Sequence, residues 1–247
     1  MAPPRAMMSG VEQAIEAFSN GQPVLVFDSA FREQETDLLF PASAAKPSAI
    51  RQLRKDCGGL LFLAIGDEVG GGFGLPWLQD LHINQELVKE NPVLHHLMTN
   101  DLQYDSRSAF TLSLNHRETF TGITDRDRSL TTRRFSELWS EIQSRELTEN
   151  ERMEALGKEF RTPGHIPVCR ESPGGLANRQ GHTELAVAVA RMAGLPPIVI
   201  GAEMLQPDGD AALSVEDAQK YGEKHGIPFL SGDDILIASG LKRGDKN

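Results

Sequence analysis

The sequence predicts an α+β fold: a single domain of the three-layer α/β/α type, covering residues 1–247 and built on a mixed sheet. Two continuous apolar runs, 23–27 and 197–202, have the length and composition of buried strands, and helical patterns alternate with such runs. Several strands are joined by hairpin-like or long loop connections, and no glycine fingerprint follows the first strand. These observations favour a mixed sheet over a Rossmann fold.

The composition and charge of the chain limit what the protein binds. Its 247 residues provide an ample core for one large domain or two small ones. A formal net charge of −10 disfavours nucleic acid and anionic membranes as partners. No run reaches the length of a membrane span and the N-terminus has no apolar signal core, so we expect a cytoplasmic protein. The two cysteines, Cys57 and Cys169, cannot form a disulfide framework.

The first elements are indicated by cap and strand patterns. Residues 9–12 have the spacing of a capping box, which predicts a helix that ends at Asn20-Gly21. Residues 23–27 form the first buried strand, and the charged segment 28–37 leads from it into the apolar residues 38–40. Such a segment either leaves the core as a solvated loop or lines a cleft.

The later elements follow from the same signals. Gly70-Gly71-Gly72 predicts a flexible loop, and the segment 162–165 predicts a turn. Residues 144–157 are highly charged and fit either a solvated helix or a linker. The remaining predictions are a helix capped by Ser48 and ending near Cys57, strands at 60–65, 109–114 and 166–169, helices at about 132–143 and 214–225, and a frayed tail at 239–247.

The stretch 179–190 places a polar cluster at the start of a well-formed helix. The cluster is Arg179-Gln180-Gly181-His182-Thr183-Glu184, and Gly194 with Pro196 ends the helix. Unpaired N–H groups and the positive end of the helix dipole make such a start a natural seat for phosphate. Arginine can pair with a phosphate, threonine can donate a hydrogen bond and histidine can ligate a metal. The alternative is an ordinary capped helix in which Thr183 satisfies backbone N–H groups.

Acids and histidines recur directly after buried strands, before strands or at helix starts. The set comprises Glu33, Glu35, Asp37, His165, His182 and Glu203. Carboxylates and imidazoles placed in this way indicate metal-assisted acid–base chemistry on a phosphorylated substrate.

Taken together, these segments resemble the 3,4-dihydroxy-2-butanone 4-phosphate synthase family. That family has an Arg-Glu-Asn-Glu-Gly-Asp signature before Leu-Ile-Phe, a Phe-Thr-Val-Ser strand, a Thr-Gly-Ile-Ser loop, a Pro-Gly-His turn, an Arg-Gly-Gly-His-Thr-Glu-Ala helix start and a strand ending in glutamate. The matching segments here are 32–40, 110–113, 121–124, 163–165, 179–185 and 198–203. The matches run in order over a core of about residues 11–238.

The resemblance implies a lyase of riboflavin biosynthesis that converts D-ribulose 5-phosphate to L-3,4-dihydroxy-2-butanone 4-phosphate and formate. It implies a homodimer with the active site at the interface. It also implies two Mg²⁺ ions, replaceable by Mn²⁺, held by Glu33 and His182 together with substrate oxygens and water. The other implied roles are substrate binding by Arg32, Asp37, Arg179, Gln180, Gly181, Thr183 and Glu203, and catalysis by His165 and Glu203, with Glu35 and Cys57 as weaker candidates.

The implied reaction explains why these residue types are needed. Forming an enediol requires a base that removes a proton from the carbon beside a carbonyl, and metal ions that stabilise the resulting enediolate. Loss of the C1 hydroxyl then requires an acid, and a skeletal shift and attack by water release formate. One base, one acid and a metal pair suffice, so no organic cofactor is expected.

The chain departs from the family's pattern at a few positions. Ser29-Ala30-Phe31 replace most of the acidic lead-in, Gln180 replaces the first glycine of a pair, and Asn115 replaces the usual aspartate. Thr36 stands where the family has a glycine, and we expect an altered turn there because threonine resists positive φ. None of these changes removes an implied metal ligand or proton carrier.

Two other functions stay open at this point. One is a different metal-dependent sugar-phosphate isomerase or aldolase that shares the enediolate step; formate release distinguishes it. The other is a non-catalytic homologue that only binds sugar phosphate. A silent site has no chemical need for Arg32, Glu33, His165, His182 and Glu203 together, which argues against this second alternative.

Overall fold

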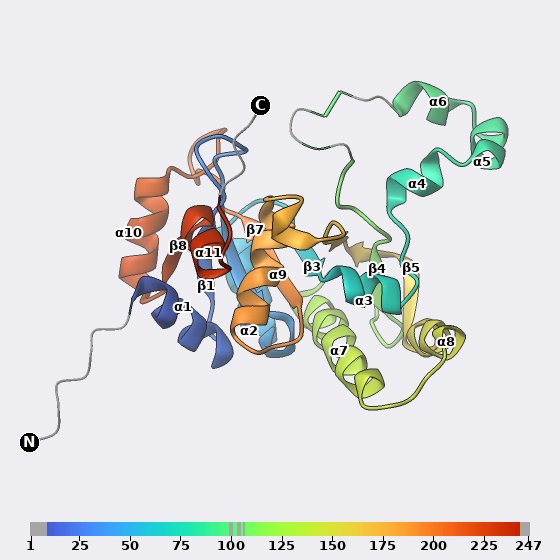
Figure 1. Ribbon diagram of the computed structural model, residues 1–247, viewed down its shortest axis with the longest axis horizontal. Coiled ribbons are helices and arrows are strands. Elements are labelled where there is room, and N and C mark those ends of the chain that lie inside the picture. The colour runs from blue at the N-terminus through green and yellow to red at the C-terminus, as the bar shows by residue number, and fades with distance from the viewer. Residues whose placement is uncertain (1–8, 99–100, 103–104, 106, 243–247) are drawn as a thin grey trace, which may run out of the picture.

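The computed structural model describes residues 9–98, 101–102, 105 and 107–242, and its centre is a six-stranded sheet (Figure 1). The strand order is β6-β3-β7-β2-β1-β8. The strands are β1 (Val24–Phe27), β2 (Thr36–Pro41), β3 (Phe62–Ile65), β6 (Val168–Arg170), β7 (Ile198–Glu203) and β8 (Phe229–Ser231). β7 is antiparallel to both of its neighbours, whereas β1 with β8 and β3 with β6 are parallel pairs. The predicted mixed sheet is confirmed.

Both faces of the sheet are apolar, because successive side chains of its strands alternate between two cores. In β3, Leu63 and Ile65 belong to one core cluster, whereas Phe62 and Ala64 belong to the other. The first core is covered by α2 (Pro47–Asp56), α3 (Asp67–Gly72), α7 (Asp125–Gln143), α8 (Glu149–Glu159) and α10 (Val215–His225), and the second by α1 (Gly10–Ser19), α9 (His182–Met192) and α11 (Gly232–Ala238). Helices on both faces give the predicted three layers (Figure 1).

Several helix starts agree with the capping patterns of the sequence. In α1, the Glu12 N–H donates to Ser9 Oγ at 3.3 Å and the Ser9 N–H donates to Glu12 Oε2 at 2.8 Å, which confirms the capping box. In α10, Ser214 Oγ accepts the Asp217 N–H at 3.1 Å. Within the highly charged segment 144–157 the helical alternative is correct, because α8 begins after Thr148 in a second capping box.

Two helix starts were predicted wrongly. Ser48 lies inside α2, which begins with Pro47 after Lys46, and no side chain caps it. Proline fits the first helical turn because its missing N–H would be unpaired there anyway. The helix predicted from about 132 is α7, which already begins at Asp125 with Thr124 as its cap. The first turns of α7 consist largely of polar residues, so the sequence has no apolar periodicity that would indicate this start.

The glycine-rich segment 70–72 lies in α3 and is not the predicted flexible loop. Val69 and Phe73, which flank this segment, are buried in the core. A Cβ at Gly72 would lie 2.6 Å from the ring of Trp139, and one at Gly70 would overlap the side chain of Arg170. The glycines therefore permit close packing, which the local sequence does not reveal.

A second, two-stranded sheet consists of β4 (Leu114–His116) and β5 (Phe160–Ile166). The predicted strand at 109–114 is wrong in its bounds, since only its last residue lies in β4 and Phe110 forms an isolated bridge to Cys169. Leu114 pairs with Ile166 and the next residue, Asn115, pairs with Arg161. The predicted turn at 162–165 is therefore a four-residue bulge within β5, and the strand predicted at 166–169 is divided between β5 and β6.

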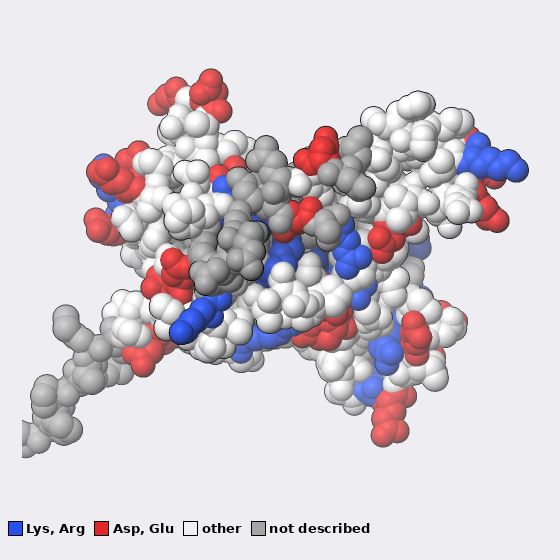
Figure 2. All heavy atoms as spheres, turned by 45° about the horizontal axis from the view of Figure 1, so that its top comes forward, with Lys and Arg blue, Asp and Glu red and all other residues white. Residues whose placement is uncertain are grey.

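An arm of three short helices stands out from the body (Figures 1 and 2). It consists of α4 (Leu78–His82), α5 (Gln85–Glu90) and α6 (Val93–Leu97), none of which contains a buried residue. His95 and His96 on this arm are exposed. Two short 3₁₀ helices, Ala42–Ala44 and Gly175–Ala177, lie elsewhere in the chain.

The end of the chain adds elements that the sequence patterns did not indicate. β8 extends the sheet and α11 packs on the second core, so the ordered fold continues to Ala238. The tail predicted from residue 239 follows directly, and its residues 243–247 lie outside the described part of the chain. None of the helices within the described residues combines the length and apolar character required to cross a membrane.

Candidate active site

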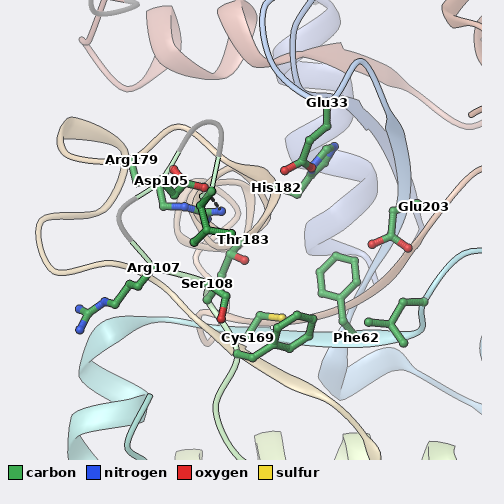
Figure 3. A pocket seen from close by; sticks show the side chains of 14 residues that line it. Glu33, Phe62, Asp105, Arg107, Ser108, Cys169, Arg179, His182, Thr183 and Glu203 are labelled. Atoms are coloured by element: carbon green, nitrogen blue, oxygen red, sulfur yellow. Dashed lines mark hydrogen bonds and ion pairs between the residues drawn. The ribbon is translucent and has the colours of Figure 1, made fainter. Parts of the chain in front are cut away.

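The acidic loop between β1 and β2 is organised by a buried carboxylate. Asp28 is 1% exposed, and its two oxygens accept the N–H groups of Glu33 at 2.9 Å and Glu35 at 3.1 Å. Gln34 between them has a φ of 59°, which closes the loop tightly. Thr36 is extended in β2, so the expected conflict between threonine and positive φ does not arise at that position. The loop projects Glu33 beside the start of α9 (Figure 3).

His182, the first residue of α9, contacts this loop through both ring nitrogens. Its Nδ1 lies 2.9 Å from Glu33 Oε2, and its Nε2 lies 3.6 Å from Asp37 Oδ1 and 3.3 Å from the Glu35 carbonyl oxygen. Asp37 is fully buried at the start of β2, where it pairs with Glu203 of β7. Among the described residues, neither Asp37 oxygen has a hydrogen-bond partner. A buried carboxylate without such partners is unusual unless a ligand or ion supplies them.

The electrostatics of this cluster favour a bound cation. The hydrogen bond to His182 lowers the pKa of Glu33, so its carboxylate is ionised at neutral pH. Burial opposes protonation of His182, but the charges of Asp37 and Glu33 outweigh it and raise the pKa of His182. Burial also raises the pKa of Asp37. Several carboxylates thus surround one imidazole, and either a proton on that ring or a metal ion bound to it would balance their charge.

A divalent metal fits the donor atoms that are present. Asp28, Glu33 and His182 each offer one ligand atom, and these atoms lie within 4.8 Å of one another. Two carboxylates and an imidazole suit Mg²⁺ or Mn²⁺, and Mg²⁺ keeps several waters rather than filling its shell with protein atoms. The fit supports Glu33 and His182 as metal ligands and adds Asp28 to them.

A second group of charges surrounds Arg179, just before α9. Its guanidinium donates to Glu184 Oε2 at 2.5 Å and to Asp105 Oδ2 at 2.8 Å, and Arg32 binds the same Asp105 oxygen at 3.1 Å. The Glu184 side chain is fully buried, so this ion pair fixes the arginine at the helix start. Two arginines that share one carboxylate oxygen form a site suited to an anion.

Thr183 lies between these two groups. It is 5% exposed, and Gly181 occupies the N-cap position of α9 without a side-chain cap. The interpretation in which Thr183 caps the helix is therefore wrong, and its hydroxyl is directed to the cavity (Figure 3). Gly181 has no side chain that could bond the N–H groups of the first turn.

These groups meet in one cavity of about 260 Å³, which we call the central cavity. Its lining consists of Glu33, Leu60, Phe62, Leu102, Asp105, Arg107, Ser108, Ala109, Phe110, Cys169, Arg179, His182, Thr183 and Glu203. Figure 3 shows Arg179 with Asp105 on one side, Glu33 with His182 on another and Glu203 on a third. Burial raises the pKa of Glu203, which keeps part of its population protonated closer to neutral pH.

Of the residues predicted for the site, Glu33, Arg179, His182, Thr183 and Glu203 line the central cavity. The others lie around it or away from it. Arg32, Glu35 and Asp37 contact its lining residues Asp105 and His182, and Gly181 directly precedes His182.

Three more predicted residues do not line the central cavity. His165 is exposed on the β5 bulge, and Gln180 donates to the Lys242 carbonyl oxygen at 3.4 Å. Cys57 is buried at the end of α2, and burial raises the pKa of its thiol well above the ordinary value. A thiol in that state is unreactive at neutral pH.

Sequence reasoning missed Asp28, Cys169 and Asp105, and also the lining residues Arg107 and Ser108. Asp28 follows the first buried strand directly, and this position was the available signal for it. Cys169 lines the cavity beside β3, where burial raises the pKa of its thiol to about 12. Asp105 lies in a weakly patterned segment, and only its contacts with Arg32 and Arg179 reveal it.

The sequence profile of 3,4-dihydroxy-2-butanone 4-phosphate synthase matches residues 12–238 of this chain. The chain belongs to this family. It is therefore a lyase, and its family acts on a sugar phosphate in riboflavin biosynthesis.

Relatives at about 40% identity cover almost the whole chain. The 3,4-dihydroxy-2-butanone 4-phosphate synthase of Methanothermobacter thermautotrophicus is 39% identical over 226 residues, which are 92% of this chain and 94% of the relative. That of Archaeoglobus fulgidus is 40% identical over 231 residues, 93% of this chain and 94% of the relative. Each match thus covers more than nine tenths of both chains.

Solved structures of the family share the fold. The synthase of Candida albicans is 27% identical, has a TM-score of 0.69, and aligns over 95% of this chain and 99% of its own. A synthase crystallised in complex with two magnesium ions has a TM-score of 0.70 at 22% identity, over 94% of this chain and 97% of its own.

Proposed function

We propose that the protein converts D-ribulose 5-phosphate to L-3,4-dihydroxy-2-butanone 4-phosphate and formate, with Mg²⁺ as the cofactor. One observation carries the proposal: the candidate metal ligands Glu33 and His182, the anion-binding Arg179 and Thr183, and the protonatable Glu203 line the same cavity. A sugar phosphate that is to be enolised needs these three kinds of group at once. Family membership supports the same reaction.

Glu33 and His182 are the proposed ligands of two Mg²⁺ ions, with Asp28 as a third donor. The family structure that contains two magnesium ions supports this number. We expect Mn²⁺ to substitute, because it takes the same ligand types. When bound, the ions would stabilise the negative charge that develops on the enediolate oxygens.

The substrate phosphate is proposed to bind at the start of α9. Arg179 is held there by buried Glu184, and the N–H groups of the first helical turn point toward the same end. Thr183 donates from its hydroxyl, while Gln180 and Gly181 shape the turn. Arg32 is the second cation of this site through its contact with Asp105.

Two further groups are proposed to act on the carbon skeleton. Glu203 accepts and releases the proton of the substrate carbon beside the carbonyl, because its raised pKa suits a group that must do both. Asp37 accepts a hydrogen bond from a substrate hydroxyl, since its buried oxygens have no hydrogen-bond partner among the described residues. Glu35 and Cys57 stay weaker candidates, and the raised pKa of Cys57 argues against its thiolate.

His165 is proposed to reach the substrate from a second subunit. It is exposed and lies outside the central cavity of its own chain, although its role requires contact with the substrate. In a homodimer with the active site at the interface, the β5 bulge of one subunit completes the cavity of its partner. A cross-complementation experiment tests this: mixing inactive His165→Ala and Glu203→Gln chains would restore activity in a shared site but not in separate ones.

The decisive experiment is incubation with ribulose 5-phosphate and Mg²⁺, followed by assay of formate. Stoichiometric formate supports the proposal, and its loss on chelation supports the metal requirement. Isomerised sugar phosphate without formate would identify the isomerase or aldolase alternative. Substrate binding without any turnover would identify a non-catalytic sugar-phosphate-binding homologue. We also expect the protein to work in the cytoplasm.

A further inference from the structure

The carboxylate of Asp105 lies between two arginines at the central cavity (Figure 3). Its Oδ2 accepts hydrogen bonds from Arg179 at 2.8 Å and from Arg32 at 3.1 Å. The three side chains are largely shielded from water, with exposed fractions of 18% for Asp105, 15% for Arg179 and 10% for Arg32. The carboxylate therefore holds both guanidinium groups firmly, because little water screens the charges.

Arg179 has a second carboxylate partner, and the two partners differ in their place in the fold. Glu184 lies within α9, its side chain has no exposed surface, and it also accepts the Ser172 N–H at 2.9 Å. Asp105 belongs to the chain between the arm and β4, outside the helices and strands, and it lines the central cavity. Glu184 is thus a fixed partner of Arg179, whereas Asp105 stands where a ligand in the cavity can replace it.

The charge of an anion decides whether it can take the place of Asp105. A sugar phosphate carries close to two negative charges at neutral pH, because its second pKa is about 6. Its three oxygens can accept hydrogen bonds from Arg179, from Thr183 and from the first turn of α9 at the same time. An anion with a single charge, such as chloride, gains no more from the arginines than Asp105 already does.

We infer that Asp105 is a specificity-determining residue, whose carboxylate occupies the two arginines in the substrate-free protein and gives way to an anion with two charges, such as the substrate phosphate. An occupied site lowers the apparent affinity of every anion by the fraction of molecules in which the site is open. Abundant anions of low affinity then no longer fill the site, whereas a phosphate dianion still does. This inference rests on the proposed function and concerns the selection of the substrate.

Isothermal titration calorimetry with inorganic phosphate tests the inference on the full-length protein and needs no turnover. At about pH 8 phosphate is mostly dianionic, and Asp105→Asn should lower its Kd at least about tenfold, the size of one charge-assisted hydrogen bond. The amide has the shape of the carboxylate and keeps one acceptor oxygen, so the variant removes the charge with little effect on packing. Added chloride should weaken phosphate binding more in Asp105→Asn than in the parent, because the carboxylate no longer occupies the arginines.

Asp80→Asn is the matched control. Asp80 pairs with Arg107 at 3.4 Å and its side chain is 49% exposed, so this variant removes the same charge from an aspartate–arginine pair that does not include Arg32 or Arg179. Its phosphate Kd and its response to chloride should equal those of the parent. A comparable gain in Asp80→Asn would assign the effect to the net charge of the chain and overturn the inference.

An unchanged or raised Kd in folded Asp105→Asn would also overturn the inference, since Asp105 would then hold the arginines in place for phosphate. Arg179→Lys locates the effect: combined with Asp105→Asn, it should abolish the gain in affinity, and a gain that persists would contradict the assignment to Arg179. If the protein releases no formate, the proposed function fails while the phosphate titrations still decide the inference, so the two failures can be told apart.

Discussion

Replacing Gly59 by alanine should move Glu203 without altering its chemistry. A Cβ at Gly59 would lie 2.6 Å from the backbone oxygen of Glu203 and 2.8 Å from its Cβ. Favourable contacts begin near about 3.5 Å, so the two segments would have to separate by about 0.7–0.9 Å. Backbone hydrogen bonds hold these two segments together on both sides of the contact. The Gly59 N–H donates to the Glu203 carbonyl oxygen at 3.0 Å, and the Leu205 N–H donates to the Cys57 carbonyl oxygen at 2.8 Å. The strain therefore falls on the end of β7, where Glu203 enters the central cavity.

A displacement of this size at a reacting group costs about 10²-fold in rate. Overpacking should also lower the free energy of unfolding by about 1–3 kcal/mol. Formate release at saturating Mg²⁺ measures the first effect and urea unfolding the second. Magnesium binding should be retained, since Glu33 and His182 lie on other segments.

Gly157→Ala is the matched control for this experiment. A Cβ there would meet nothing within 4 Å, and the residue is exposed inside α8. Alanine should stabilise that helix by about 0.5–1 kcal/mol and leave turnover unchanged. Parent-level formate release by a folded Gly59→Ala protein would refute the argument that the position of Glu203 limits the rate.

Three further predictions concern the metal and anion sites. Glu33→Gln and His182→Ala should each weaken Mg²⁺ binding at least about tenfold by isothermal titration calorimetry, because neither replacement restores the lost ligand; unchanged affinity in either variant removes that residue from the metal site. Arg179→Ala should raise KM for ribulose 5-phosphate and lower the free energy of unfolding by about 3–5 kcal/mol, since buried Glu184 loses its partner, whereas Arg179→Lys should recover stability but not KM. Asp105→Asn should lower KM, because its carboxylate no longer competes with phosphate for Arg179, and a raised KM would show that Asp105 positions the arginine instead.

The layers of the fold could be predicted because their signals are local. The strand run 24–27 and the helix after the Ser9 capping box are specified by residues within a few positions of each other. The helix at Gly70 to Gly72 could not be predicted, because the side chains that demand glycine there come from Trp139 and Arg170, far along the chain. The same holds for the β5 bulge, whose register depends on β4.

Only part of the candidate site could be predicted, because some of its residues belong to no recognisable motif and join the site only through contacts in the fold. Residues on a recognisable motif, such as Glu33 and His182, could be placed by resemblance, and they meet in the structure. Asp105 belongs to no motif and enters the site only through its contacts with two arginines. His165 was expected in the same site, yet its own chain leaves it outside the central cavity.

In the proposed metal site, the buried carboxylate of Asp28 would link the stiffness of a loop to the binding of a cation. Its oxygens already accept the N–H groups of Glu33 and Glu35, so an ion that takes one of them must share or replace a hydrogen bond. Binding free energies are reciprocal, and any change that favours the loop's bound shape raises metal affinity by the same factor. Gln34, the one non-glycine residue with positive φ in the described chain, is exposed at the tip of this loop. Substitution there would tune how tightly the metal is held from a position that never touches it.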